Sequence, residues 1–325
     1  MRLCGSAVPM IHPTNAGGLG FFDLHQCGFD NKNLERAGLD HSLLPKMVSD
    51  GEILGEFSDC TPEGNFGSAG PRRSIPVCVS IGDNQASFLG SVQDSLGSVS
   101  VNIGTGSQIS LVSSGFENSG ALEARPFFED QFLLVGASLC GGRAYAILEK
   151  FFRQVIKMAG FPGDASLYDA MDAMAGTAAS AGAESTDEPS LTVNTLFAGS
   201  RSDPSVRGSI QNISENNFTP ARLITGFLNG AVQELYDFYQ PLRKENNEAH
   251  VIVGAGNGIR KSEPLKRILS EKFNMPLEIP LYEEEAAYGA ALYALTCTGY
   301  FKTLSQAQSL VKYKGTIDFR KSRQS

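Results

Sequence analysis

The sequence predicts an α/β fold, and three of its segments carry that prediction. An apolar alternation over 75–81 ends in Gly82-Asp83-Asn84-Gln85, which is typical of a strand that runs into a helix. A second alternation resumes after Gly104-Thr105-Gly106, which indicates a hairpin with a small tip. The apolar run 250–253 leads through the glycine-rich residues 254–258 toward another helical pattern. Strands that alternate with helices in this way build a sheet covered by helices.

Length and composition set the limits of this fold. The chain has 325 residues, of which 42% are hydrophobic, enough for a sizeable core and about two domains. A net charge of -8 without a long basic stretch argues against nucleic acid as a partner. No apolar run approaches the ~18 residues of a membrane-spanning helix, and residues 1–15 lack the apolar core of a signal peptide. We therefore expect neither a nucleic-acid nor a membrane partner.

The cysteine and histidine patterns favour a cytoplasmic protein that is not a zinc enzyme. Six cysteines are scattered without a CxxC pair, which is typical of reduced thiols in a cytosolic chain. Four histidines form no metal-ligand spacing and are interpreted as structural or surface residues.

The first 60 residues show no core of their own. A polar, glycine-rich stretch at 15–18 is followed by a short helical pattern at 33–38 that glycine closes. A loop rich in Gly, Pro and Ser covers 62–73. This region is expected to be the end of a domain rather than a complete one.

The junction at 82–85 and the tip at 104–106 have the residues of a phosphate-handling site. Two glycines around Thr105 let backbone N–H groups and one hydroxyl approach an anion closely. A helix start favours the ionised form of Asp83, which could then accept a proton from an attacking hydroxyl. A simpler interpretation also stands, because Asp is a common N-cap and Gly-Thr-Gly a common turn.

Further elements are predicted between the hairpin and the glycine-rich turn. A strand at 132–136 precedes Gly141-Gly142 and an amphipathic helix at 144–158. The two glycines suit either a simple helix start or the close approach of a nucleotide. Residues 174–190, rich in Ala, Gly and Ser, are predicted to form a mobile surface segment.

The last third of the chain continues the pattern of strand and helix. Pro220 opens a strongly amphipathic helix, on which Glu234 is interpreted as solvated or part of a polar network. The glycine-rich turn lets a nucleotide lie against bare backbone, although such glycines can also serve tight packing alone. It is not a Rossmann fingerprint, since its third glycine comes early. Helices are expected from Ser262 and, after three glutamates, over 286–295, with a loose basic tail after Gly315.

Taken together, these motifs resemble the FGGY carbohydrate kinases. The agreement lies in the order and spacing of four motifs: Gly82-Asp83-Asn84-Gln85-Ala86, Gly104-Thr105-Gly106-Ser107, Val253-Gly254-Ala255-Gly256 and the helix at 285–291. Within that family the chain is most similar to the sedoheptulokinases, through Leu3-Cys4-Gly5, Asn15-Ala16-Gly17, Gly20-Phe21-Phe22 and Leu43-Leu44-Pro45. Xylulokinase-like and glycerol-kinase-like enzymes come next, and the similarity extends over nearly the whole chain.

The resemblance implies an actin-like ATPase (ribonuclease H-like) fold with two domains. Residues 1–96 would be the carboxyl-terminal remnant of the first domain, which binds the sugar and holds the catalytic Asp. Residues 97–325 would be the nucleotide-binding second domain. ATP and Mg²⁺ are the implied cofactors. Because the family's Asp-x-Gly-Thr hairpin does not precede Asp83, the first domain is expected to be incomplete.

The same resemblance assigns roles to individual residues. Asp83 is the expected general base, with Mg²⁺ near it through water, and Asn84 is the expected sugar contact. The phosphate hairpin would consist of Gly104, Thr105 and Gly106, with Thr105 near the transferred phosphoryl group. Gly142 would lie beside the nucleotide, and the adenosine turn would consist of Gly254, Ala255 and Gly256.

The expected activity is the ATP-dependent phosphorylation of a ketose, with sedoheptulose converted to sedoheptulose 7-phosphate. The alternatives are a truncated, non-catalytic nucleotide-binding protein, a xylulokinase- or glycerol-kinase-like enzyme, and a chaperone- or actin-like ATPase. The expected partners are the sugar and ATP. The identity of the sugar stays open, as does the oligomeric state, for which a homo-oligomer is one option.

Overall fold

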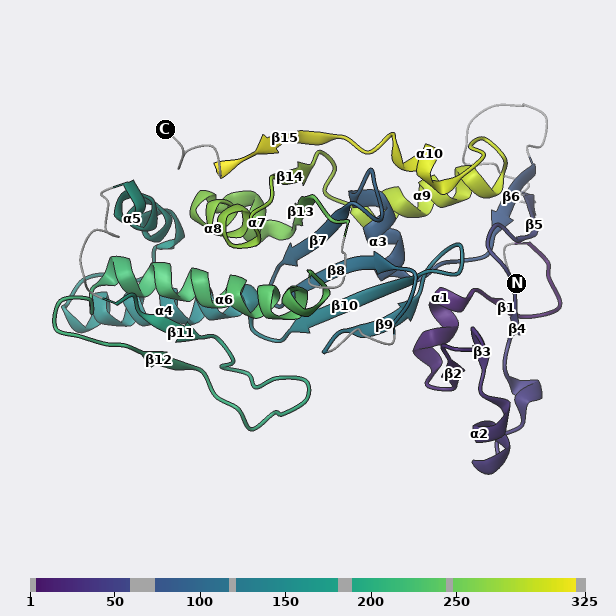
Figure 1. The fold of residues 1–325 in the computed structure, drawn as a ribbon, viewed down its shortest axis with the longest axis horizontal. Helices are drawn as coiled ribbons and strands as arrows, with labels where there is room; N and C mark the ends of the chain where they lie inside the picture. Colours follow the sequence, from purple (N-terminus) through teal and green to yellow (C-terminus); the bar gives the residue numbers. More distant parts are fainter. Residues whose placement is uncertain (1–3, 59–73, 117–120, 181–188, 244–247, 320–325) are drawn as a thin grey trace.

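A computed structural model describes residues 4–58, 74–116, 121–180, 189–243 and 248–319. Its main feature is a seven-stranded sheet (Figure 1) in the order β15-β14-β13-β7-β8-β10-β9. In chain order these strands are β7 (Ser98–Ile103), β8 (Ser107–Ser113), β9 (Glu123–Pro126), β10 (Phe132–Ser138), β13 (Val251–Ala255), β14 (Leu277–Pro280) and β15 (Tyr313–Ile317). The predicted hairpin, β7 to β8, and the predicted strands at 132–136 and 250–253 are confirmed.

The register of the central strands brings two glycine-rich turns to one edge of the sheet. β7 pairs with β8 in antiparallel fashion, with Ile103 opposite Ser107, so the tip at 104–106 follows directly. β7 also pairs with β13 in parallel, with Asn102 opposite Ala255. Because parallel strands end at the same edge, the turn after β13 lies beside the hairpin tip.

Helices cover both faces of the sheet. One face carries α4 (Gly141–Met158), α5 (Tyr168–Ser180), α6 (Pro220–Arg243), α7 (Gly256–Lys261) and α8 (Glu263–Phe273), and the other carries α3 (Asp83–Ser91) and α9 (Glu285–Cys297). The short helix α10 (Leu304–Gln308) packs against α9. None of the helices in the described part of the chain combines the length and apolar content needed to cross a bilayer.

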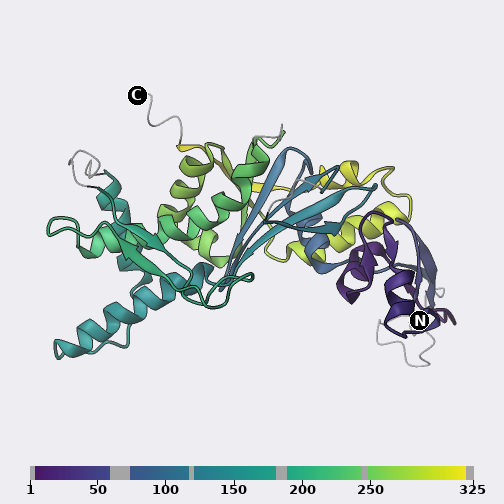
Figure 2. The same cartoon turned by 60° about the horizontal axis from the view of Figure 1, so that its bottom comes forward.

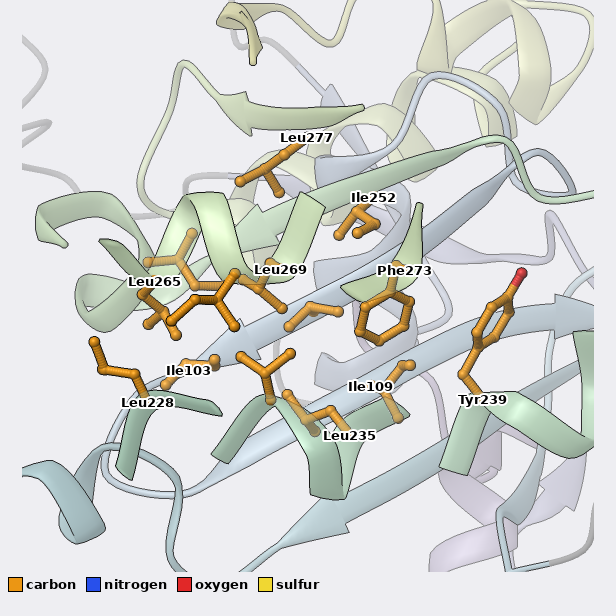
Figure 3. Close-up of a cluster of buried hydrophobic side chains, with 14 of the residues drawn as sticks. Ile103, Ile109, Leu228, Leu235, Tyr239, Ile252, Leu265, Leu269, Phe273 and Leu277 are labelled. Carbon is orange, nitrogen blue, oxygen red and sulfur yellow. The ribbon is translucent and has the colours of Figure 1, made fainter. Parts of the chain in front are cut away.

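The core is built from alternate residues of the strands. In β8, Leu111 packs toward α6 and α8, whereas its neighbour Val112 packs toward α3 and α9. In β10, Leu134 faces the first layer and Leu133 the second. Figure 3 shows the first layer, where side chains of β7, β8 and β13 meet those of α6 and α8. A strand buried on both faces is apolar at nearly every position, as β10 and β13 are, whereas β7 and β8 alternate apolar residues with small polar ones.

The amino-terminal part lies at one end of the molecule, beyond the sheet (Figure 2). It consists of short elements: β1 (Met10–Ile11), α1 (Pro13–Ala16), η1 (Gly17–Leu19), β2 (Phe22–Asp23), β3 (Gly28–Phe29), α2 (Asn31–Arg36), η2 (His41–Leu43), β4 (Lys46–Met47), β5 (Ile53–Ser58) and β6 (Ser74–Cys78). They pair as β1-β4, β2-β3 and β5-β6. Within the described stretch 4–58, Ala16 and Leu34 are the only buried hydrophobic residues, so this region has no core of its own, as predicted. A last pair, β11 (Thr192–Asn194) with β12 (Ser209–Gln211), lies along α6.

Three expectations about local structure were wrong in part. Residues 174–180, predicted to be a mobile segment, belong to α5, whose Met171 and Ala175 pack into the core; 181–188 lie outside the described residues. The chain turns helical at Gly256, as α7, before α8 begins after its N-cap Ser262. After Gly315 the chain stays in β15 as far as Ile317, paired with Leu277, whereas 320–325 lie outside the described residues.

Two glycines let α3 and α9 touch through their backbones. A Cβ atom added to Gly289 of α9 would lie 2.7 Å from the carbonyl carbon of Ala86 and 2.8 Å from the nitrogen of Gly90, both on α3. A Cβ atom added to Gly90 would lie 2.6 Å from the nitrogen of Gly289. The helix that begins at Asp83 is therefore seated directly on α9.

Candidate active site

Three neighbouring cavities open along the edge where β7 and β13 end. The central cavity has a volume of about 540 Å³. It shares Asp83 and Asn84 with a cavity of about 410 Å³ beside α1, here called the α1 cavity. It shares Gly104 and Thr105 with a cavity of about 730 Å³ beside α4, here called the α4 cavity. Asp83 thus lies where the central cavity meets the α1 cavity, and the hairpin tip lies where it meets the α4 cavity.

Asp83 is the first residue of α3, and its carboxylate is exposed at the junction of two cavities. The N-cap is Gly82, which has an extended backbone and no side chain to cap the helix, so the interpretation of Asp83 as an N-cap is wrong. One carboxylate oxygen of Asp83 accepts the N–H of Asn84 at 2.7 Å. Its other oxygen has no hydrogen-bond partner among the described residues and is open to a ligand.

The hairpin tip is held by the start of α4. The N–H groups of Gly142 and Arg143 donate to the carbonyl oxygens of Gly104 and Thr105, at 2.9 and 3.0 Å. A Cβ atom on Gly142 would collide with the Gly104 carbonyl oxygen, so glycine is required there for close approach to the tip. α4 thus occupies two of the three tip carbonyls, and the third, of Gly106, accepts the N–H of Gly104 at 2.9 Å. The tip can therefore offer a ligand the N–H groups of Thr105 and Gly106 and the Thr105 hydroxyl.

Two buried polar atoms on the wall of the central cavity have no partner among the described residues. They are Oδ1 of Asn84 and Oγ of Ser107. The amide of Asn84 is oriented by its Nδ2, which donates to Oε1 of Gln108 at 3.1 Å, and Nε2 of Gln108 donates to Ser110 at 3.0 Å. Leaving a buried polar atom unpaired costs about 1–3 kcal/mol. Both atoms therefore indicate a polar ligand in this cavity.

The residues of the glycine turn after β13 line two different cavities. Ala255 lines the central cavity, whereas Gly256 lines the α4 cavity together with Asn257 and Gly258. Gly256 has φ +82, and a Cβ atom there would lie 2.5 Å from Oδ1 of Asn102, so only glycine fits without strain. Gly254 lines none of the three cavities, and a Cβ atom on it would meet Ile259 at 2.9 Å. Its local role is tight packing.

The α4 cavity has apolar walls with a few polar groups. Phe227, Leu228 and Ala231 of α6 form one wall. Tyr145 and Tyr168 also line the cavity, with their ring centroids 5.8 Å apart, and the Tyr145 hydroxyl donates to Asp172 at 2.7 Å. Burial, together with this bond to Asp172, raises the pKa of Tyr145, so it stays a neutral donor. Such a mixture of flat apolar surface and few polar groups suits an aromatic base.

The α1 cavity is polar by comparison. Glu123 and Arg125 of β9 form a two-pronged ion pair, with distances of 3.0 and 3.1 Å, and both line the cavity. Thr14 and Asn15 of α1 also line it. Alternating donors and acceptors of this kind suit a ligand with several hydroxyl groups.

Two family models match the chain. Residues 99–297 match the C-terminal domain of the FGGY family of carbohydrate kinases, and residues 1–90 match the N-terminal domain of the same family. The chain belongs to the FGGY family of carbohydrate kinases. The resemblance inferred from the motifs is thereby confirmed.

The FGGY chain is similar to curated kinases of different substrates. It is 28% identical over 303 residues to a sedoheptulokinase of Mus musculus, a match that covers 90% of this chain and 60% of that protein. It is 26% identical over 312 residues to a glycerol kinase of Rhodopseudomonas palustris, covering 92% of this chain and 57% of that protein. The chain thus spans about 60% of the length of these curated relatives.

Solved structures agree with the FGGY assignment at the level of the fold. A xylulose kinase from Rhodospirillum rubrum superposes with a TM-score of 0.78 at 20% identity, covering 98% of this chain and 61% of that one. A glycerol kinase from Plasmodium falciparum with ADP superposes with a TM-score of 0.76 at 19% identity, covering 97% and 60%. The predicted actin-like ATPase fold is confirmed.

The FGGY fold brings together most of the residues to which the sequence assigned a role. The central cavity is lined by Asp83, Asn84, Gly104, Thr105, Gly106 and Ala255. The α4 cavity is lined by Gly142 and Gly256. Gly254 stands apart, as described above. The individual roles, and the division into domains at residue 96, stay predictions.

Several residues of the candidate site carry no functional signal in the sequence. Tyr145, Tyr168 and Asp172 come from two helices whose patterns signal only burial. Ser107 belongs to the hairpin motif but received no role. Glu285, explained from sequence by the helix dipole alone, forms a buried ion pair with Arg260 at 2.7 Å, which ties the end of α7 to the start of α9.

The sequence allows two interpretations of Glu234, a solvated residue or a member of a polar network. The structure places it in a network. Its Oε2 accepts the hydroxyl of Ser138, on the wall of the central cavity, at 2.8 Å, and the hydroxyl of Thr195 at 3.5 Å. Burial raises the pKa of Glu234 above its usual value, although these two hydrogen bonds act in the opposite direction. Glu234 orients Ser138 from outside the cavity.

Proposed function

We propose that the protein transfers a phosphoryl group from ATP to a hydroxyl group of a ketose, with Asp83 as the general base. One observation carries this proposal: Asp83 stands between a polar cavity and a cavity lined by the glycine hairpin, which in turn borders the α4 cavity. A sugar, a phosphoryl group and a nucleotide would therefore lie in line. Phosphoryl transfer asks for this positioning, for charge stabilisation and for a base.

In this mechanism the α1 cavity binds the sugar, and Asn84 contacts it beside Asp83. The open carboxylate oxygen of Asp83 takes the proton of the attacking hydroxyl group. The hairpin donors, with Thr105 nearest the transferred group, receive the phosphate oxygens. The nucleotide base lies between Tyr168 and the apolar wall of the α4 cavity, with the adenosine against Gly256.

The residues of the central cavity are compatible with Mg²⁺. Asp83 is the only carboxylate among the described residues that line this cavity, and no cluster of three or more His, Cys, Asp or Glu residues suited to a metal occurs in the described part of the chain. Mg²⁺ is commonly bound by one or two carboxylates, several waters and phosphate oxygens. Bound there, the ion would neutralise phosphate charge, with Asp83 holding it through water.

We propose sedoheptulose as the sugar and the cytoplasm as the location. The similarity to a mouse sedoheptulokinase supports the first proposal, and the glycerol and xylulose kinases are the alternatives. The five described cysteines are free thiols, which suits the cytoplasm.

The test is ADP release by the chain with ATP, Mg²⁺ and, in turn, sedoheptulose, xylulose, ribulose and glycerol. Release that requires a sugar, and is fastest with sedoheptulose, is the expected result. ATP binding without release on any sugar would contradict the proposal in favour of a nucleotide-binding protein. Release that no sugar changes would instead indicate an ATPase.

Ser107 gives a second expected result. Because its buried hydroxyl has no partner in the described protein, Ser107→Ala should leave the melting temperature unchanged or raise it. The same change should lower sugar-dependent turnover about tenfold, the worth of one hydrogen bond to a charged group. Ser91→Ala is the matched control, since it removes a buried hydroxyl that does bond, to the carbonyl of Phe88 at 3.0 Å, away from the cavities. It should lower the melting temperature and spare turnover.

A further inference from the structure

A fully buried histidine stands behind the start of α3. His12 has no exposed surface, and its Nε2 lies 2.7 Å from Oδ1 of Asp50. Its Nδ1 lies 2.8 Å from the hydroxyl oxygen of Thr14. The imidazole ring is packed between Phe128 and Tyr293, with ring centroids 5.6 and 6.1 Å away. From the sequence alone, His12 is interpreted only as a structural or surface residue.

The hydrogen bonds around His12 determine which groups donate and which accept along the series Asp50, His12 and Thr14. Nδ1 accepts the N–H of Thr14, the first-turn bond of helix α1, at 3.3 Å. Nδ1 is therefore the acceptor nitrogen, and Nε2–H donates to the carboxylate of Asp50. The Thr14 hydroxyl then donates to Nδ1 with its hydrogen, which leaves its oxygen lone pairs free for another donor.

That other donor is the backbone next to Asp83. The N–H of Gly82 donates to Oγ1 of Thr14 at 3.0 Å. A second bond runs in parallel, because Nδ2 of Asn15 donates to the carbonyl of Ser80 at 2.9 Å. Gly82 has no room for a side chain, since a Cβ atom there would lie 3.1 Å from the Thr14 carbonyl oxygen and collide with the amide of Gln85. The two peptide groups that lead into Gly82, those of Ser80–Ile81 and Ile81–Gly82, are thus held from α1.

Asp50, at the other end of this series of hydrogen-bonded groups, is also held in place. Oδ2 of Asp50 accepts the N–H of Glu129 at 2.9 Å, and the N–H of the next residue, Gly51, donates to the hydroxyl of Tyr293 on α9 at 3.0 Å. Desolvation alone would raise the pKa of Asp50, but the hydrogen bonds from His12 and Glu129 outweigh it, and the pKa is lowered. Asp50 is therefore an ionised acceptor that holds the imidazole by a charge-assisted bond.

We propose that Asp50, His12 and Thr14 form a relay of positioning residues that sets the orientation of Asp83 toward the sugar hydroxyl. The inference rests on the proposed function, in which Asp83 is the base. A base must be held in reach of the proton that it removes, and a misplacement of about 1 Å can cost on the order of 100-fold in rate. Asp50, His12 and Thr14 would hold Asp83 in position without taking part in the reaction themselves.

Substitution of Asp50 distinguishes this positioning role from direct contact with the sugar. Thr14 lines the α1 cavity, so a change there could act through contact with the sugar. Asp50 lines none of the three cavities. An effect of Asp50 on turnover therefore cannot arise from its own contact with the sugar. If the three residues act as one unit, changes at Asp50 and Thr14 will not be additive.

The experiment compares the wild-type chain with Thr14→Val, Thr14→Ser, Asp50→Asn and the double variant Thr14→Val/Asp50→Asn. Thr14→Val is expected to lower kcat at least about tenfold with the KM for ATP unchanged. Thr14→Ser should restore kcat to within about twofold, because it keeps the hydroxyl. Asp50→Asn should also lower kcat, and the double variant should be no slower than Thr14→Val. Thr225→Val, which removes a hydroxyl bonded to the Ala221 carbonyl at 2.9 Å on α6, is the control with unchanged kcat.

A second readout does not depend on turnover. Hydrogen exchange at residue resolution should show that the amide of Gly82 exchanges faster in Thr14→Val and Asp50→Asn than in wild type, Thr14→Ser or Thr225→Val. Wild-type kcat in Asp50→Asn, or additive losses in the double variant, would overturn the relay. An unchanged Gly82 amide in Thr14→Val would do so as well. If the wild-type chain turns over no sugar, the proposed function fails, and the exchange of Gly82 alone decides whether the relay exists.

Discussion

Replacing Asp83 with asparagine should lower sugar-dependent ADP release about 10²- to 10⁴-fold, the range that a general base contributes. The amide oxygen of asparagine can still accept the N–H of residue 84, which Asp83 accepts at 2.7 Å, so the start of α3 should be preserved. An amide cannot take the proton of the sugar hydroxyl. Because Asp83 does not line the α4 cavity, the affinity for ATP in the absence of Mg²⁺ should stay within about twofold of wild type.

The measurement pairs steady-state ADP release with ATP titration by calorimetry. Asp164→Asn is the matched control: its carboxylate is 84% exposed and pairs with Lys157 at 2.8 Å, away from the cavities. It should change neither quantity. Turnover in Asp83→Asn equal to that of Asp164→Asn would rule out Asp83 as the base.

Gly289→Ala should lower the free energy of unfolding by about 3 kcal/mol or more, at the upper end of what overpacking costs. The added methyl group would meet backbone atoms of α3, at 2.7 Å from the carbonyl carbon of Ala86 and 2.8 Å from the nitrogen of Gly90. Backbone atoms cannot rotate aside as a side chain would. The two helices must therefore separate, and the apolar contacts around Phe88 and Tyr293 would loosen.

Urea denaturation, followed by circular dichroism, measures this change. Gly176→Ala in α5 is the control, because a Cβ atom there meets nothing within 4 Å. In that helix alanine should raise stability by about 0.5–1 kcal/mol. Equal unfolding midpoints for the two variants would show that α3 and α9 are less tightly joined than their backbones indicate.

The parts of the fold that the sequence predicts are those where one local pattern decides the structure. The hairpin of β7 and β8 follows from strict alternation that stops at two glycines, and α6 follows from its apolar face. Asp83 and Thr105 could be found for a related reason. Each stands in a short run where the chemistry of the neighbours, a helix start or bare glycines, already suggests a role.

Other parts depend on contacts that no local pattern contains. α5 is rich in Ala, Gly and Ser, and it is helical because Met171 and Ala175 reach a core built by distant segments. α7 begins with Gly256, a poor helix former, held by β7. His12 is surrounded by Asp50, Phe128 and Tyr293, which meet only in the folded chain.

The bonds from α4 to the hairpin tip also limit how this site can change in evolution. Gly104 and Gly142 lie far apart in the sequence, yet the amide of one meets the carbonyl of the other at 2.9 Å with no space for a methyl group between them. A larger residue at position 142 could be tolerated only together with a new path for the tip. The path of the tip therefore restricts position 142 to glycine, whereas a Cβ atom on Gly104 would meet nothing within 4 Å, so position 104 and the walls of the α1 cavity should vary long before position 142 does.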